Sequence, residues 1–382
     1  MTPKQLVYAA FGGMPADRMA VSVPYTFLYY LDHFAELTGR PQWELKKWYY
    51  APLDEYLSVC RQIIEAAPFD ILQPPPSASA EERADVEFVE RDGMPLLHRK
   101  RDDLYEPLVV SESGHAVESA INEERYVFNE ADMCERLQFD SAEKMIASGA
   151  NDHLDAFVEE FGNNWFVLTG GVIGTFYMCH HYVGMTNLLE MVITQPSFVH
   201  MMSKRILEYN IEMIRRYAAA GGDAIYIDDA MATSDLISRA HYEEFCLPYV
   251  SEMVREIHRL GHKAILIYFG GVADRLEEIA STGADALLME TSMKGYNNDI
   301  EEIATRIGDR MMLFGNIDPI RIVQDGTDKE LAAEIERQAK AGRIARGFVM
   351  STGSPLTPST PLARVKRFIE LARNGSYERA AI

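Results

Sequence analysis

The stretch GGDAIYIDDA, residues 221–230, decides the fold of this chain. Two glycines lead into an apolar run that ends on two adjacent carboxylates, Asp228 and Asp229. A short run rich in β-branched and aromatic residues, ended by Gly, Asp, Pro or Ser, is typical of a buried strand. The stretch therefore predicts a strand that carries two acids at its carboxyl end.

Seven more runs of the same kind lie along the chain, and stretches of helical period separate most of them. They are RMAVSVP from 18, FDILQPPP from 69, WFVLTGG from 165, KAILIYFGG from 263, DALLMETS from 285, MMLFGNIDP from 311 and GFVMSTGSP from 347. Eight strands that alternate with helices predict an α/β fold, a (β/α)8 TIM barrel with an N-terminal extension.

One region departs from this alternation. Residues 77–125 alternate polar and apolar residues around Asp92-Gly93, which is a hairpin turn signal. We expect a β-rich antiparallel insertion there. No repeat, low-complexity tract or linker divides the chain, so we expect one barrel domain over 1–382.

The excess of acidic residues argues against some classes of binding partner. Lys and Arg number 37 against 58 Asp and Glu, a formal net charge of −21. Such a surface repels phosphate backbones and anionic lipids, so neither nucleic acid nor membrane is an expected partner. The N-terminus lacks an apolar run of signal-peptide type, and we expect a cytoplasmic protein.

In barrels of this type, catalytic side chains stand at the carboxyl ends of the strands. Side chains alternate along a strand, so Ile225 and Ile227 share one face and Asp228 lies on the other. If the aliphatic pair faces the helices, Asp228 points into the barrel mouth. Asp229 then caps a helix, contacts a loop or binds the ligand. Neighbouring carboxylates raise one pKa, bind a cation or hold a cationic or hydroxylated ligand.

Later strand ends supply further candidates. Glu290 ends DALLME and is expected to join Asp228 in a set of acids at the mouth. FGNIDP offers Asn316 as a substrate ligand, whereas Asp318 before a proline is better read as a turn acid. The last strand end contributes Ser351, a group suited to hydrogen bonding a ligand.

Aromatic residues and histidines gather after two of the strands. TFYMCHHYVGM, residues 175–185, contains Tyr177 and the adjacent His180 and His181, of which at most one is expected to be a ligand or acid–base group. Tyr268, beside a glycine pair, is either a contact for a planar ligand or an aromatic residue of the core.

The chain resembles the uroporphyrinogen decarboxylase superfamily, which includes cobamide-dependent methyltransferases. The resemblance is carried by residues 221–258, by LIYFGGVADRLEEIASTGADALLME, by LFGNIDP and by GFVMSTGSPLTPSTPLARVKRFIELAR. It implies a barrel with its cleft at the carboxyl ends of the strands. Tyr182, in HHYVGMTNLL, is similar to the family's active-site tyrosine.

Two departures separate this chain from branches of that superfamily. Decarboxylases carry an arginine-containing RQAGR segment that grips the substrate carboxylates, whereas the matching region here reads VSVPYTFLYYLDHF. Coenzyme M methyltransferases hold zinc through an HxC and a later cysteine, but the matching stretches here read IYFG and STG. A zinc site of that type is not expected, and any other metal stays unknown.

The resemblance therefore implies a methyltransferase that moves a methyl group from an O-methyl or N-methyl small molecule to a corrinoid (cobalamin) protein. Asp228, Glu290, Tyr182 and His180 are its catalytic candidates. Residues suited to bind substrate are Asp229, His181, Tyr177, Tyr268, Asn316 and Ser351. The alternatives are a carboxy-lyase of the decarboxylase type and a non-catalytic binding protein. A homodimer is expected from the family alone.

Overall fold

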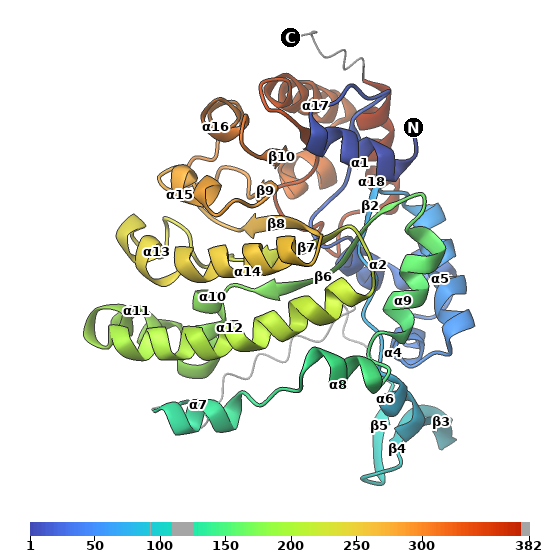
Figure 1. Cartoon of the computed structure of the whole chain (residues 1–382). Coiled ribbons are helices and arrows are strands. Elements are labelled where there is room, and N and C mark those ends of the chain that lie inside the picture. The colour runs from blue at the N-terminus through green and yellow to red at the C-terminus, as the bar shows by residue number, and fades with distance from the viewer. Residues whose placement is uncertain (92, 109–125, 128, 376–382) are drawn as a thin grey trace.

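The structure is a computed structural model that describes residues 1–91, 93–108, 126–127 and 129–375. Its central feature is an eight-stranded parallel sheet in the order β1-β11-β10-β9-β8-β7-β6-β2, which curls into a nearly closed barrel (Figure 1). The strands are β1 (Ala20–Val21), β2 (Ile71–Leu72), β6 (Phe166–Ile173), β7 (Ala224–Asp228), β8 (Lys263–Tyr268), β9 (Ala286–Met289), β10 (Met312–Phe314) and β11 (Phe348–Met350). All eight runs predicted from the sequence are strands, so the predicted barrel is confirmed.

The seam between β1 and β2 closes the barrel without a regular ladder. The backbone N–H of Asp70 donates to the Val21 carbonyl at 2.9 Å. The buried Asp70 carboxylate accepts from the Val21 N–H at 2.8 Å and from the guanidinium groups of Arg18 and Arg373. One side chain therefore joins the first strand, the second strand and the C-terminal helix.

Alternation along the strands separates two cores. Ala224, Ile265 and Ile267 point into the barrel, while Ile225 and Ile227 pack outward against the helices. The predicted alternation in β7 is thus confirmed, with the aliphatic pair on the helix side.

Helix α1 (Pro3–Gly12) closes the amino-terminal end of the barrel. Thr2 and Gln5 form a reciprocal capping box at its start. Its apolar face contributes Leu6 and Phe11 to the inner core, and Phe11 stacks on Phe166 of β6. Helix α1 therefore covers the amino-terminal end of the barrel.

The remaining helices surround the strands or connect them (Figure 1). They are α2 (Thr26–Asp32), α3 (Phe34–Thr38), α4 (Glu44–Tyr49), α5 (Leu53–Ala66), α6 (Ala80–Asp85), α7 (Glu130–Arg136), α8 (Ala142–Ala147), α9 (Asp152–Phe161), α10 (Thr175–Val183), α11 (Met185–Thr194), α12 (Pro196–Ala219), α13 (Arg239–Phe245), α14 (Leu247–Arg259), α15 (Leu276–Ser281), α16 (Ile300–Ile307), the π-helical turn η2 (Pro319–Gln324), α17 (Asp328–Gly342) and α18 (Leu362–Asn374). Within the described residues, no helix combines the length and the apolar character needed to cross a bilayer.

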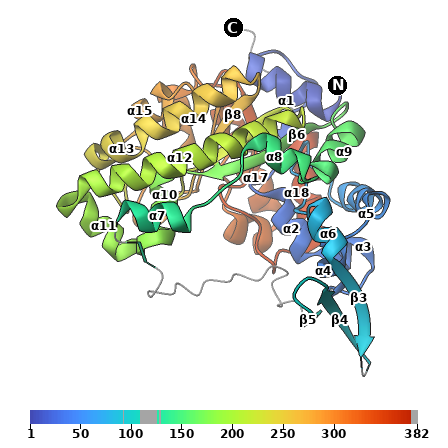
Figure 2. The same ribbon diagram turned by 60° about the horizontal axis from the view of Figure 1, so that its bottom comes forward.

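The predicted antiparallel insertion is also confirmed. Strands β3 (Val86–Arg91), β4 (Met94–Arg99) and β5 (Leu104–Pro107) form a separate three-stranded sheet. Gly93 follows β3 with a φ of 76°, the left-handed conformation that the hairpin turn requires. Figure 2 shows this sheet projecting away from the barrel. Residues 109–125 of the predicted insertion lie outside the described part of the chain.

Candidate active site

Asp228 ends β7 on the inner face, as the sequence predicted. Its carboxylate accepts a 2.6 Å hydrogen bond from the hydroxyl of Tyr25 and a 3.1 Å bond from the backbone N–H of Ala230. Burial raises the pKa of Asp228 to about 6, although these two hydrogen bonds oppose the rise. A carboxyl group with a pKa near neutrality is suited to give or take a proton.

Tyr25 was not identified from the sequence. It follows β1, and its backbone is left-handed, with φ 50° and ψ 59°, a conformation that costs a non-glycine residue about 1–3 kcal/mol. Its ring lies against Tyr226 and Phe269, with centroid separations of 5.5 and 5.8 Å. Nothing in the local sequence pattern marks the tyrosine that stands in this segment.

Asp229 points to the opposite side of β7 and is fully buried. Neither carboxylate oxygen forms a hydrogen bond with any residue that the structure describes. Burial, and then the charge of Asp228, raise the pKa of Asp229 to about 7, while Tyr268 and Arg275 oppose the rise. Asp229 therefore neither caps a helix nor reaches the mouth, but it lies against Gly174 in the connection between β6 and α10. Near neutral pH it exists partly as the acid.

Glu290 follows β9 at the same end of the barrel. The hydroxyl of Tyr296 donates to one carboxylate oxygen, and Ser354 donates to the other at 2.8 Å. Both partners come from loops that follow barrel strands. The sequence predicted the acid and missed the two hydroxyl groups that fix its orientation.

The aromatic and histidine cluster lies on α10. Burial and the charge of Asp228 raise the pKa of Tyr177, which places its hydroxyl within electrostatic reach of that carboxylate. His180 stacks on Tyr177 with ring centroids 5.2 Å apart, and His181 is exposed beside it. Of these three residues, Tyr177 interacts with Asp228, and the two histidines lie beside it on α10.

The structure does not bring four other predicted site residues into the mouth. Tyr268 packs outward, where its hydroxyl lies 2.8 Å from that of Tyr242, because the inner face of β8 belongs to Ile265 and Ile267. Tyr182 faces the outer core, with the Arg136 guanidinium 5.9 Å from its ring centroid.

The other two residues, Asn316 and Ser351, form hydrogen bonds within the protein. The side-chain amide of Asn316 donates to the Glu290 and Asn298 carbonyls and accepts from Gln338. Ser351 is fully buried and donates to the backbone carbonyl of Thr352. Asp318 caps η2 through the N–H groups of Ile320 and Arg321, which confirms its reading as a turn acid.

The carboxyl ends of the barrel strands, which form the mouth, carry acidic side chains but no basic ones. The three residues that follow each of the eight barrel strands include no Lys, Arg or His. They do include Glu290, and Asp228 immediately precedes them. Charge therefore disfavours a substrate that brings several carboxylates to this end of the barrel.

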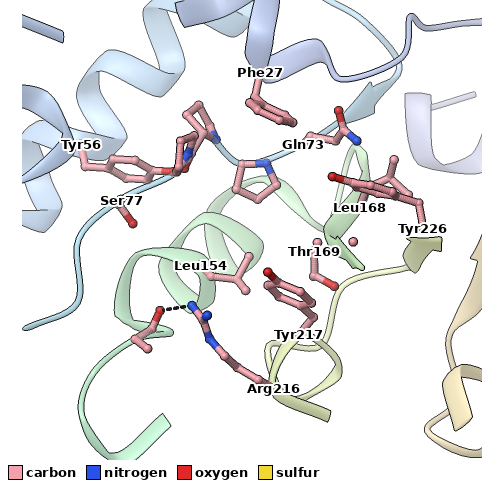
Figure 3. Close-up of a pocket in the computed structure, with 16 residues that line it drawn as sticks. Phe27, Tyr56, Gln73, Ser77, Leu154, Leu168, Thr169, Arg216, Tyr217 and Tyr226 are labelled. Atoms are coloured by element: carbon pink, nitrogen blue, oxygen red, sulfur yellow. Dashed lines mark hydrogen bonds between the residues drawn. The ribbon is translucent and has the colours of Figure 1, made fainter. Parts of the chain in front are cut away.

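A pocket of about 300 Å³ lies between residues 73–77, which follow β2, and residues 168–171 of β6. Figure 3 shows Phe27, Gln73 and Tyr226 at one end of this pocket and Arg216 at the other. Nothing in the sequence pattern predicted it. Among the described residues, no group of three or more His, Cys, Asp or Glu side chains is arranged to hold a metal ion.

Comparison with known proteins gives two kinds of similarity. The family model described as uroporphyrinogen decarboxylase (URO-D) matches residues 123–375. The uroporphyrinogen decarboxylase of Chlorobium luteolum is 30% identical over 191 residues, which are 49% of this chain and 52% of that protein. That of Coxiella burnetii is 30% identical over 194 residues, with 49% and 50% covered. The chain thus spans about half the length of the curated relatives it matches.

Among solved structures, a methyltransferase from Methanosarcina mazei superposes over nearly the whole chain. The TM-score is 0.67 with 16% sequence identity, and the alignment covers 97% of this chain and 98% of the other. At this level of identity the likeness shows a shared fold.

Proposed function

Because the chain belongs to the uroporphyrinogen decarboxylase family, we propose that it is a methyltransferase of that family, which transfers a methyl group from an O-methyl or N-methyl small molecule to a corrinoid protein. The observation that carries the proposal is the mouth, where Asp228 and Glu290 stand without a cation at any strand end. A porphyrinogen presents several carboxylates, which these acids repel. A neutral or cationic methyl donor meets no such repulsion.

Asp228 acts as the general acid in this proposal. For an ether donor, the bond between oxygen and methyl breaks, its electron pair stays on the oxygen, and Asp228 delivers a proton there. The corrinoid supplies the cobalt nucleophile that accepts the methyl group in line with the breaking bond. Tyr25 holds the Asp228 carboxyl group in place through its hydroxyl.

The test is methyl transfer to cob(I)alamin, followed by absorbance, with methoxyaromatics and methylated amines as donors. Replacing Asp228 by Asn keeps the shape and removes the acid, and we expect the rate to fall by about 10²–10⁴-fold. In the native protein the rate should fall as the pH rises through about 6, because the acid form of Asp228 is then lost.

Asp309→Asn is the matched control, since that side chain is 82% exposed and precedes β10, at the amino-terminal side of the strands. It should leave the rate unchanged. Absence of methyl transfer from every donor, together with carboxylate loss from a porphyrinogen, would overturn the proposal in favour of the decarboxylase activity named for the curated relatives.

A further inference from the structure

The pocket beside the mouth exists because two neighbouring strands part. The ladder between β2 and β6 consists of Ile71–Leu72 against Phe166–Val167 and then ends. Beyond it, β6 is irregular between Leu168 and Gly170, while the chain after β2 continues as Gln73–Ser77. The resulting gap, of about 300 Å³, runs from the inside of the barrel to the outer helices. That volume is at the small end for ligand sites and suits a single-ring molecule.

Flat aromatic and proline side chains form part of the wall of this side pocket, beside polar groups. Glycines at 170 and 171 allow the rings of Tyr217 and Tyr226 to lie directly against β6, where an added Cβ would meet ring atoms at 2.5 and 2.1 Å. On the facing wall, the Tyr56 hydroxyl donates to the Pro75 carbonyl at 2.8 Å and fixes the proline segment. Rigid aromatic and proline surfaces of this kind favour a planar, aromatic ligand.

The inner end of the pocket carries polar atoms that lack partners. Gln73 and Thr169 are each 4% exposed and line the pocket. The Gln73 Oε1 and Thr169 Oγ1 atoms form no hydrogen bond with any described residue. A buried polar atom without a partner is costly, and such atoms in a pocket mark where a ligand atom completes the hydrogen bonding.

The outer end carries a positive charge. The guanidinium of Arg216 donates to the Asn151 side chain at 2.9 Å and to the Ala150 carbonyl at 2.7 Å. It lies 5.4 Å from the centroid of the Tyr217 ring. Within the described parts of the chain, Arg216 forms no salt bridge with a carboxylate. Neutral partners therefore hold the guanidinium in place. Asp155 lies within electrostatic range but forms no salt bridge with Arg216, so the guanidinium is still able to pair with an anion.

We propose that the side pocket binds an aromatic carboxylic acid that carries an ether or phenol oxygen. The carboxylate pairs with Arg216, the ring lies against Tyr217 and the proline segment, and the oxygen reaches Gln73 and Thr169. Figure 3 shows Gln73 and Arg216 at opposite ends of one pocket, with Thr169 beside Tyr217 between them. Its inner end adjoins Tyr226, which shares the inner face of β7 with Asp228.

The binding itself does not depend on the proposed function. A role of this ligand as the methyl donor rests on that function and also requires its ether oxygen to reach Asp228, which does not line the pocket. A single carboxylate is directed to the outer end, away from the acids of the mouth. The pocket thus admits a monoanionic aromatic acid, while the mouth still disfavours a substrate with many carboxylates.

The experiment measures binding of para-methoxybenzoate to the full chain by isothermal titration calorimetry without corrinoid. Arg216→Gln should weaken binding by about tenfold or more, because a charge-assisted contact is lost. The same change should leave binding of the neutral para-methoxybenzyl alcohol unaltered. Arg215→Gln is the matched control, since Arg215 is the preceding residue and pairs instead with Glu212 and Glu256.

Thr169→Val keeps the test decisive if Arg216→Gln folds poorly. Because the Thr169 hydroxyl has no partner, its removal should not lower the melting temperature. It should weaken binding of para-methoxybenzoate several-fold and leave that of para-methylbenzoate unchanged. The proposal would be overturned if Thr169→Val bound para-methoxybenzoate as tightly as the native protein does. It would also be overturned if the native protein did not bind para-methoxybenzoate at millimolar concentration.

The two proposals fail separately. Binding that depends on Arg216, without methyl transfer from any donor, supports the side pocket and contradicts the methyltransferase. Methyl transfer from para-methoxybenzoate at the same rate and KM in native and Arg216→Gln protein supports the methyltransferase and contradicts the side pocket.

Discussion

At the scale of single residues, Asp229 occupies an environment that opposes its charge. It is fully buried beside another carboxylate, and its pKa is raised to about 7 from an ordinary value of 3.8. The folded protein therefore binds this proton more tightly than the unfolded chain does. Stability from this group is fully present below pH of about 4 and is lost as the pH rises towards 7.

Asp229→Asn should remove that loss, because the amide resembles the neutral acid. We expect the variant to be more stable than the native protein at pH 8, by about 4 kcal/mol, and equally stable near pH 4. Urea unfolding at several pH values measures this difference, with Asp309→Asn as an exposed control. If the native protein and the variant lost the same free energy of unfolding between pH 4 and 8, the raised pKa of Asp229 would be contradicted.

The alternation of side chains along a strand predicted the position of Asp228 in β7 but not that of Tyr268 in β8. In β7 the flanking aliphatic residues identified the inner face, and Asp228 was assigned to the mouth from the sequence. In β8 every residue except Lys263 is apolar or aromatic, so the pattern did not say which face holds Tyr268. Hydroxyl partners such as Tyr25 and Ser354 come from distant parts of the chain, and no local pattern predicts their positions.

At the scale of elements, the strands were predictable and their junctions were not. Eight apolar runs gave the barrel, although β1 and β2 are only two residues long. The junction of β6 with α10 depends on Gly174, whose backbone N–H donates to the Asp228 carbonyl at 2.7 Å. A Cβ at this position would lie 2.1 Å from Oδ1 of the buried Asp229.

Gly174→Ala should therefore displace the end of β7 together with its acids. We expect a loss of stability of about 2 kcal/mol, because the Asp229 side chain has no free space to occupy. Gly295→Ala, at a position where an added Cβ meets nothing within 4 Å, should change stability little. Differential scanning calorimetry compares the two variants. If both have the native melting temperature, then the close approach at the start of α10 does not constrain the site.

At the scale of the whole molecule, closure of the barrel rests on contacts between parts of the chain that are far apart in sequence. Asp70 follows a helix by four residues, but its partners Arg18 and Arg373 lie near opposite ends of the chain. The sequence predicted strands around a barrel and gave no register for this seam. The side pocket has the same origin, because it lies where the second ladder ends and not within any element.

Asp70→Asn tests how much this seam contributes. The substitution leaves two arginines facing a neutral group at a fully buried position, and breaking such a pair typically costs about 3–5 kcal/mol. Asp328→Asn is the matched control, since Asp328 also joins two arginines, Arg364 and Arg367, but on the surface. Urea unfolding should show a much smaller loss for the control, because solvent screens that charge. A loss in Asp70→Asn no larger than in the control would mean that apolar packing alone holds the first and second strands together.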